Sequence, residues 1–342
     1  MANQRFQNAL SRTPQDIPPV WFMRQAGRYH KHYQALRAKH TFMEMCKDAD
    51  LAAEVAMGPI QDFDFDLAIL FSDLLFPLEA MGMGLTYDPA PTLAWQLTPD
   101  TVAKLRSPNE AIAGLEFQRD AVRATRARLP KDKSLIGFVG GPWTLFAYAV
   151  EGSHKGELSL AKRYIASFKA FCDKVVPLLE QNIRLQLEGG AEVVMVLDTA
   201  AGELSPTMFE ETIDSTIKKL AEKFPGQLGY YAKGINPQHL RHPLFQKRGV
   251  LGGLGFDHRW EMTEVLKTQQ LGFIQGNFDQ SLLFLEPKAF EARALAYLEG
   301  IKKLPPETRA GWVSGLGHGV MPQTPEENVR SMVRLIREVM AR

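Results

Sequence analysis

The feature that most constrains the fold is a set of short apolar runs that recurs along the chain, with longer amphipathic stretches between them. The runs are apolar throughout rather than alternating, which is typical of strands that are buried on both faces of a parallel sheet. Because runs and helical stretches alternate, we expect successive βαβ units. Eight runs are expected to form strands: residues 20–23, 67–71, 135–139, 193–197, 228–232, 250–254, 272–275 and 311–314.

The stretches between the runs carry apolar side chains at helical spacing. Residues 158–188 continue such a pattern over a long span, in which Pro177 is expected to introduce a kink or a division. An α/β chain with about eight strands favours closure into a (β/α)8 barrel, the TIM-barrel fold, over an open doubly wound sheet. No segment rich in Pro, Gly or Ser divides the chain, so we expect residues 1–342 to form a single barrel domain.

Charge and cysteine content exclude several classes of protein. The formal net charge is +1, which gives no general attraction to nucleic acid or to a membrane surface. Cys46 and Cys172 are the two cysteines, each in an expected helix and far from any CxxC spacing, which indicates a reducing compartment. Residues 1–19 lack the apolar segment of a signal peptide, and no run reaches the roughly 18–20 apolar residues that span a bilayer. We therefore expect a cytoplasmic protein.

Polar residues follow the expected strands at their carboxyl ends, where barrel enzymes place their active sites. In chain order these residues are Arg24 and Arg28, Ser72 and Asp73, Thr144 and Tyr148, Asp198 and Thr199, Lys233, Asp257, Asn277, and His318. One rim of the barrel is therefore expected to gather two arginines with carboxylates, hydroxyls, a lysine and a histidine.

The chemistry of this rim indicates an anionic ligand. Arg24 and Arg28 suit carboxylates or phosphates, because the guanidinium group binds both through paired hydrogen bonds. The sequence contains no P-loop, no GxGxxG between a strand and a helix, no nucleophile elbow and no spacing typical of metal ligands. From the residues alone we expect a barrel enzyme that binds an anionic organic substrate without a metal or a nucleotide. The reaction itself stays open.

Two long motifs carry a resemblance to a known family. Residues 19–29, PVWFMRQAGRY, closely resemble the N-terminal signature of the uroporphyrinogen decarboxylase family, and residues 137–152, GFVGGPWTLFAYAVEG, resemble its second signature. Residues 63–75, FDFDLAILFSDLL, also fit, and the short motifs that begin at residues 198, 276 and 317 follow in the family's order. The resemblance covers nearly the whole chain, and two long motifs at the right separation are far more specific than one short motif.

This resemblance implies a homodimeric (β/α)8 barrel that removes the four acetate carboxylates of uroporphyrinogen III without a cofactor. Methyl groups remain, and the product is coproporphyrinogen III, in heme and tetrapyrrole biosynthesis. Matched residue by residue, the family implies that Asp73 is the catalytic aspartate. It also implies a substrate-binding set: Arg24, Gln25, Ala26, Gly27, Arg28, Asp73, Tyr148, Thr199 and His318.

These implied roles agree with the chemistry of the substrate. Its eight carboxylates need cationic partners, which Arg24 and Arg28 supply. The Asp73 carboxylate can accept from several pyrrole N–H groups at once. Protonation of a pyrrole ring at carbon makes that ring the electron sink, and Asp73 then stabilises the developing positive charge. The group that delivers the proton stays open, because arginine is a poor acid and Asp73 would first have to be protonated.

Several of these residues could instead have a structural role. Arg24 and Arg28 could be solvated surface charges, Asp73 could cap the helix that follows it, and Tyr148 could be a core aromatic. Asp198 could equally be structural. We expect no catalytic role for Lys233 and Asp257, which follow the fifth and sixth runs.

Several positions depart from the family's usual wording. His30, Lys31 and His32 stand where the family has an apolar residue and a proline before an acidic one, His258 replaces a tryptophan, and Gly315 replaces an asparagine. Another departure is the segment 277–280, NFDQ in place of Asn-Leu-Asp-Pro. These departures leave a non-catalytic tetrapyrrole-binding paralogue as an alternative. A further alternative is a corrinoid-linked methyltransferase of the same superfamily, which would need a zinc-bound thiolate at the strand ends, whereas both cysteines are expected on helices.

Overall fold

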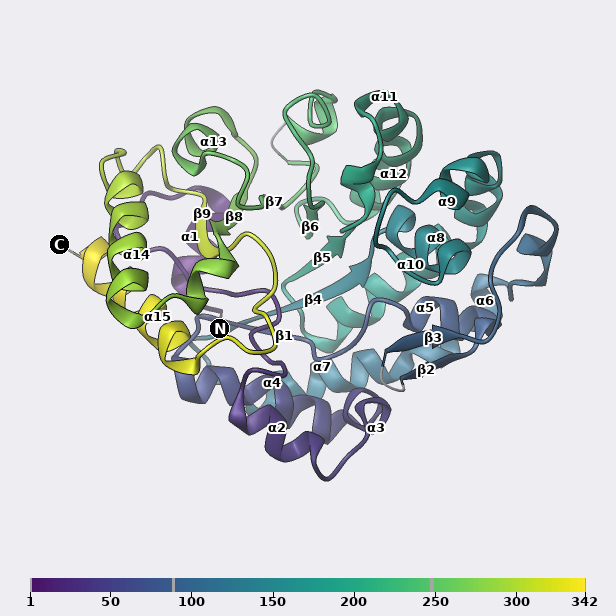
Figure 1. Ribbon diagram of the computed structural model, residues 1–342, viewed down its shortest axis with the longest axis horizontal. Helices are drawn as coiled ribbons and strands as arrows, with labels where there is room; N and C mark the ends of the chain where they lie inside the picture. The colour runs from purple at the N-terminus through teal and green to yellow at the C-terminus, as the bar shows by residue number, and fades with distance from the viewer. Residues whose placement is uncertain (1, 88–89, 247–248, 342) are drawn as a thin grey trace.

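The computed structural model describes residues 2–87, 90–246 and 249–341, and its centre is a parallel sheet of seven strands with helices outside it (Figure 1). Neighbouring strands are hydrogen-bonded in the order β1-β4-β5-β6-β7-β8-β9, and every pair is parallel. These strands are β1 (Leu67–Ile69), β4 (Ser134–Gly140), β5 (Val193–Leu197), β6 (Leu228–Tyr231), β7 (Gly253–Gly255), β8 (Phe273–Phe278) and β9 (Trp312–Leu316). A separate antiparallel pair is formed by β2 (Leu85–Tyr87) and β3 (Pro91–Leu93).

Helices precede, connect and follow the strands of the sheet, although the described residues between β6 and β7 contain no α-helix. They are α1 (Gln4–Ser11), α2 (Lys31–Arg37), α3 (Phe42–Lys47), α4 (Ala49–Phe63), α5 (Phe76–Leu78), α6 (Pro108–Ala111), α7 (Glu116–Arg128), α8 (Pro142–Glu151), α9 (Ser159–Arg163), α10 (Phe168–Gly189), α11 (Pro206–Phe209), α12 (Ser215–Lys223), α13 (Met262–Thr268), α14 (Pro287–Lys302) and α15 (Glu326–Ala341). Short 3-10 or π-helical segments cover Glu79–Met83, Pro99–Lys104, Ile112–Leu115, Ile165–Ser167, Ala201–Glu203, Glu210–Asp214, Pro243–Phe245 and Gln280–Phe284. None of the helices in the described part of the chain is both long enough and apolar enough to cross a bilayer.

Residues 19–21 close the gap between the two edge strands of the sheet. Val20 pairs in parallel with Ser314 of β9, and its carbonyl accepts from the N–H of Asp66, next to β1, at 3.0 Å. The run expected to form a strand over residues 20–23 is therefore one bridge residue, and the expectation of a full strand is wrong. Two prolines precede this residue and a turn follows it, so the segment between them is too short to pair as a full strand. With this bridge the sheet closes, and the (β/α)8 barrel expected from the sequence is confirmed.

The strands are buried on both faces because alternate side chains belong to two different cores. One set fills the interior of the barrel: Trp21, Leu67, Ile69, Ile136, Val193, Met195, Leu197, Tyr231, Phe273 and Val313. The residues between them, such as Ala68 and Val194, pack under the surrounding helices. Phe6 of α1 joins the interior cluster, so α1 covers one end of the barrel. Double burial explains why these strands read as unbroken apolar runs.

One long helical pattern divides at a different place from the one expected. Pro177 lies inside α10, which runs unbroken from Phe168 to Gly189. The division occurs earlier, at Tyr164, where the backbone leaves helical geometry and a short 3-10 turn follows. Pro177 therefore does not divide the pattern, and the alternative expectation of a kink at this proline stays a prediction.

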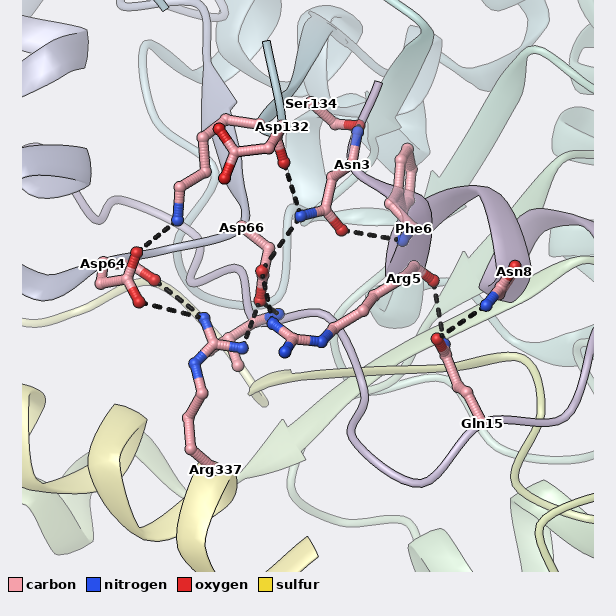
Figure 2. A network of polar contacts seen from close by, with 12 residues as sticks. Asn3, Arg5, Phe6, Asn8, Gln15, Asp64, Asp66, Asp132, Ser134 and Arg337 are labelled. Atoms are coloured by element: carbon pink, nitrogen blue, oxygen red, sulfur yellow. Dashed lines mark hydrogen bonds and ion pairs between the residues drawn. The ribbon is translucent and has the colours of Figure 1, made fainter. Parts of the chain in front are cut away.

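A buried polar network at the amino-terminal end of β1 ties the closing segment to the rest of the barrel (Figure 2). The Asp66 carboxylate accepts from the Val20 N–H at 2.8 Å and from Asn3 Nδ2 at 3.1 Å. It also pairs with Arg5 at 3.2 Å and with Arg337 of α15 at 3.0 Å. One carboxylate thus joins α1, the bridge segment, β1 and the last helix, so the network fixes the seam where the barrel closes.

Asp66→Asn is expected to lower the free energy of unfolding by about 3 kcal/mol, because both arginines and the Val20 amide would lose a buried anionic partner. The matched control is Asp64→Asn, two residues away. Asp64 also pairs with Arg337, but its side chain is 71% exposed against 2% for Asp66. Asp64 also pairs with the largely buried Lys133, and the Asn oxygen can still accept from that ammonium group. Exposed pairs contribute little, so the control is expected to cost less than about 1 kcal/mol. Urea unfolding of both variants tests this, and equal losses would contradict the assigned role of Asp66.

Candidate active site

A cavity of about 180 Å³ lies at the carboxyl ends of the strands. Six of the residues expected to bind substrate line it: Arg24, Ala26, Asp73, Tyr148, Thr199 and His318. Three others, Gln25, Gly27 and Arg28, are not among its lining residues. Apolar side chains from β1, β4 and β5 complete the wall, including Ile69, Phe138 and Leu197. Barrel closure therefore brings residues from both ends of the chain to one place.

The turn after the bridge residue determines which of its side chains face the cavity. Arg24 has a left-handed backbone with φ of 60°, a conformation that is uncommon outside glycine. The buried Gln25 donates from Nε2 to the Leu67 carbonyl at 2.9 Å. The Gln25 carbonyl accepts from the Tyr29 hydroxyl at 2.8 Å. Gln25 therefore anchors the turn to β1 and presents Arg24 to the cavity.

Arg24 is a cation without an anionic partner in the part of the chain that the structure describes. Among the described residues, its side chain forms no ion pair and no hydrogen bond. A Cβ at Gly319 would come within 2.4 Å of Arg24 Cδ, so the glycine after His318 makes space for this side chain. Arg28 is exposed and also lacks an ion-pair partner within the described ranges. Two free guanidinium groups thus remain available for an anionic ligand.

Asp73 lies in the turn between β1 and α5. Its Oδ1 accepts from the Leu75 N–H at 2.9 Å, a local bond that fixes the turn. Burial raises the pKa of the Asp73 carboxyl, while the neighbouring Tyr87 hydroxyl, the Leu75 N–H and the Arg24 charge act in the opposite direction. A carboxylate has about four lone-pair sites, so Asp73 keeps the capacity to accept from a ligand in the cavity.

Tyr148 projects from α8 and contacts His154, which follows the end of that helix. The Tyr148 hydroxyl and His154 Nδ1 are 2.6 Å apart. Burial raises the pKa of Tyr148 to about 12, with the Asp73 carboxylate adding to the shift and Arg24 opposing it. The hydroxyl is therefore protonated at neutral pH and acts as a hydrogen-bond donor or acceptor.

His318, which follows β9, forms a second histidine–tyrosine pair with Tyr231 at the end of β6. Its ring stacks on Tyr231 at 6.0 Å between centroids, with Nδ1 3.2 Å from the Tyr231 hydroxyl. That hydroxyl donates its proton to the Gly317 carbonyl at 2.8 Å, so Nδ1 must carry the imidazole proton and Nε2 is an acceptor. Burial lowers the pKa of His318 to about 3, and Arg24 and Lys233 add to this. His318 is therefore neutral at neutral pH.

Other polar residues at the strand ends are engaged with the protein. Asp198 Oδ1 accepts from both the N–H and the hydroxyl of Thr144 at 2.7 Å. Asp257 accepts from the Gly234 N–H at 2.6 Å and from Arg259 at 2.7 Å. These bonds give both carboxylates structural roles, because they order the loops that surround the cavity.

Among the polar residues that line the cavity in the described part of the chain, His154 is the one that the sequence did not predict. It stands two residues beyond the second signature, in a polar loop between α8 and α9, where a lone histidine carries no periodic signal. The one available hint was its place directly after a helix that leaves the carboxyl end of a strand.

Fold and site together define a (β/α)8 barrel with an arginine- and carboxylate-containing cavity at its carboxyl rim. Residues 1–339 match the family model described as uroporphyrinogen decarboxylase (URO-D). A protein named uroporphyrinogen decarboxylase from Geobacter sulfurreducens is 33% identical, with 98% of this chain and 99% of that protein covered. One of the same name from Chloroflexus aurantiacus is also 33% identical, with 97% and 95% covered. The chain belongs to the uroporphyrinogen decarboxylase family.

Solved structures show the same fold at lower identity. A methyltransferase from Methanosarcina mazei superposes with a TM-score of 0.79 at 20% identity and covers 98% of both chains. A structure described as a vitamin-B12-independent methionine synthase from Listeria monocytogenes gives 0.56 at 13% identity, with 95% of this chain and 98% of that one covered. At these identities the likeness establishes the barrel and nothing about the reaction.

Proposed function

We propose that this protein is a carboxy-lyase that converts uroporphyrinogen III to coproporphyrinogen III without a cofactor, in cytoplasmic heme biosynthesis. We further propose that residues 1–342 act as one barrel domain and that the protein works as a homodimer. The observation that carries the proposal is that one cavity holds both the Asp73 carboxylate and the Arg24 guanidinium, which has no ion-pair partner among the described residues. That cavity belongs to a chain of the uroporphyrinogen decarboxylase family.

The charges of the proposed residues are opposite to those of the substrate and of the cationic ring that forms in the reaction. Arg24 and Arg28 bind substrate carboxylates, and Asp73 accepts hydrogen bonds from the pyrrole N–H groups. A proton adds to a ring carbon, and the C–C bond to the acetate carboxylate then breaks, releasing CO₂. Its electron pair neutralises the cationic ring and leaves an exocyclic methylene group. A second protonation at that carbon and loss of the ring proton give the methyl group. Asp73 lowers the barrier by stabilising the cationic ring.

The remaining lining groups suit a ligand with carboxylates and N–H donors. Neutral His318 offers Nε2 as an acceptor, while Tyr148 and Thr199 offer hydroxyl groups. Ala26, two residues after Arg24, adds a small apolar surface to the lining. The cavity of about 180 Å³ is smaller than a complete tetrapyrrole. We therefore expect one pyrrole ring and its acetate inside, with the rest of the macrocycle reaching toward solvent.

Methyl transfer to or from a corrinoid is less well supported. Neither Cys46, buried in α3, nor Cys172 of α10 lines the cavity. Burial also raises the pKa of both thiols, Cys46 well above its ordinary value. A thiolate for zinc-activated methyl transfer would have to come from one of these two residues.

Purified protein treated with a chelator is expected to convert freshly reduced uroporphyrinogen III stepwise to the four-carboxyl product. Chromatography of the oxidised products would show intermediates with seven, six and five carboxyl groups. A heat-denatured sample is the control for chemical decarboxylation. Tight porphyrinogen binding without turnover would instead identify a non-catalytic paralogue and refute the proposal.

A further inference from the structure

The His154–Tyr148 pair is a polar contact inside the cavity with no obvious structural purpose. Both side chains line the cavity, and their rings lie 5.0 Å apart. Among the described residues, Tyr148 forms no other side-chain hydrogen bond, and neither does His154. The pair therefore anchors no neighbouring element, unlike Tyr231, which also bonds to a backbone carbonyl.

The direction of this hydrogen bond depends on the charge of the imidazole. A neutral ring with its proton on Nε2 accepts at Nδ1, so Tyr148 donates its single proton to His154. A protonated ring donates from Nδ1 instead. The Tyr148 oxygen then accepts from His154, and its O–H is free to donate to another acceptor. One proton on His154 thus changes what Tyr148 offers to the cavity.

We propose that His154 is a positioning residue for substrate binding: its protonation turns the Tyr148 hydroxyl from His154 toward a carboxylate of the substrate. The inference deepens the proposed function and rests on it, because it takes the ligand to be a porphyrinogen with acetate side chains. No covalent step is involved. The proton that His154 gains comes from solvent, and Tyr148 keeps its own proton throughout.

The groups that face His154 determine when it is protonated. Burial lowers the pKa of His154 from its ordinary 6.5, and the charges of Arg24, Lys155 and Lys233 add to the effect. Tyr148 contacts it directly, and the Asp73 carboxylate and neutral His318 lie in the same cavity. The empty site therefore holds His154 neutral at neutral pH.

A bound carboxylate reverses this balance. Its negative charge offsets the nearby cations and raises the pKa of His154 in the complex above that in the empty site. Binding should then take up a proton, and affinity should be highest below the pKa of His154 in the free protein. As the pH rises from that pKa to the higher pKa of the complex, the Tyr148 O–H returns to His154 and the affinity falls.

The first test needs no substrate. Protein with [15N]histidine is titrated by NMR, and the signal missing in His154→Gln assigns His154 among the eight histidines. We expect the neutral ring to carry its proton on Nε2, and to lose this preference in Tyr148→Phe. A neutral ring with its proton on Nδ1 would overturn the proposal, because His154 would then donate to Tyr148 at every pH.

The second test measures the Kd of uroporphyrin III, a stable octacarboxylate, by fluorescence between about pH 6 and 8. The wild-type Kd is expected to rise about tenfold with pH, the factor of one charge-assisted hydrogen bond. His154→Gln, which cannot titrate, should flatten this dependence, and so should Tyr148→Phe. The double variant should behave as either single variant does.

His40→Gln is the matched control, because His40 lies outside the cavity lining and its ring forms no hydrogen bond within the described ranges. It should keep the wild-type pH dependence. A His154→Gln protein that also keeps it would show that His154 only fills space, and would overturn the proposal. Both tests work without turnover, so they stay decisive if the protein binds porphyrins but fails to decarboxylate them.

Discussion

Asp73→Asn is expected to lower kcat/KM for uroporphyrinogen III by about 10²–10³-fold, the usual effect of removing one preorganised electrostatic contact to a transition state. The loss should be mainly in kcat, because the positive charge on the pyrrole ring exists only after protonation. The Asn side chain keeps an oxygen that can accept from the Leu75 N–H, as Asp73 does at 2.9 Å. The turn should therefore survive, and the loss would report the missing charge.

A second aspartate offers a matched control for this variant. Asp279 follows β8 and accepts from the N–H two residues ahead, that of Ser281, also at 2.9 Å. It has the same local bond as Asp73 but does not line the cavity. Asp279→Asn should change kcat/KM by less than about twofold, in line with the small effects of surface substitutions. Similar losses in both variants, or an active Asp73→Asn enzyme, would refute the central role of Asp73.

The barrel could be predicted from the sequence because burial of each strand leaves a pattern in that strand's own residues. Strands buried on both faces must be apolar at every position, so the run at residues 193–197 coincides with β5. The outcome for the first expected strand, residues 20–23, could not be predicted in the same way. The apolar residues of this run resemble those of a strand, but its length is set by how residues 19–21 meet Ser314 and Asp66 across the closing seam. That contact joins segments far apart in the chain.

The sequence predicted which types of residue form the candidate site better than it predicted which side chains face the cavity. The sequence gives no reason to prefer Arg24 or Arg28 as a cavity residue. In the structure Arg24 alone of the two lines the cavity, because its left-handed backbone redirects the turn. Asp73 and Asp198 both follow strands, and their hydrogen-bond partners separate them. Asp198 is bound by Thr144. Such partners are tertiary contacts, which no pattern along the chain records.

Arg24→Gln is expected to raise the KM for uroporphyrinogen III by about 10–100-fold with a smaller change in kcat. The guanidinium lacks an ion-pair partner among the described residues, so its full hydrogen-bonding capacity is available to a substrate carboxylate. One charge-assisted hydrogen bond contributes about 1.5–3 kcal/mol, and each 1.4 kcal/mol is tenfold in affinity. A ground-state carboxylate keeps its charge until CO₂ leaves, so the contact mainly affects binding.

A second readout separates loss of this charge from a simple distortion of the turn. Burial lowers the pKa of His318 to about 3, and the Arg24 charge is the next contribution. Removing that charge makes protonation easier, so Arg24→Gln should raise the pKa of His318, whereas Arg24→Lys should leave it nearly unchanged. The control Arg37→Gln removes an exposed arginine outside the cavity and should alter neither KM nor the histidine titration. An unchanged KM in Arg24→Gln would mean that the substrate carboxylates are bound elsewhere, and Arg28 would then be the cation to test.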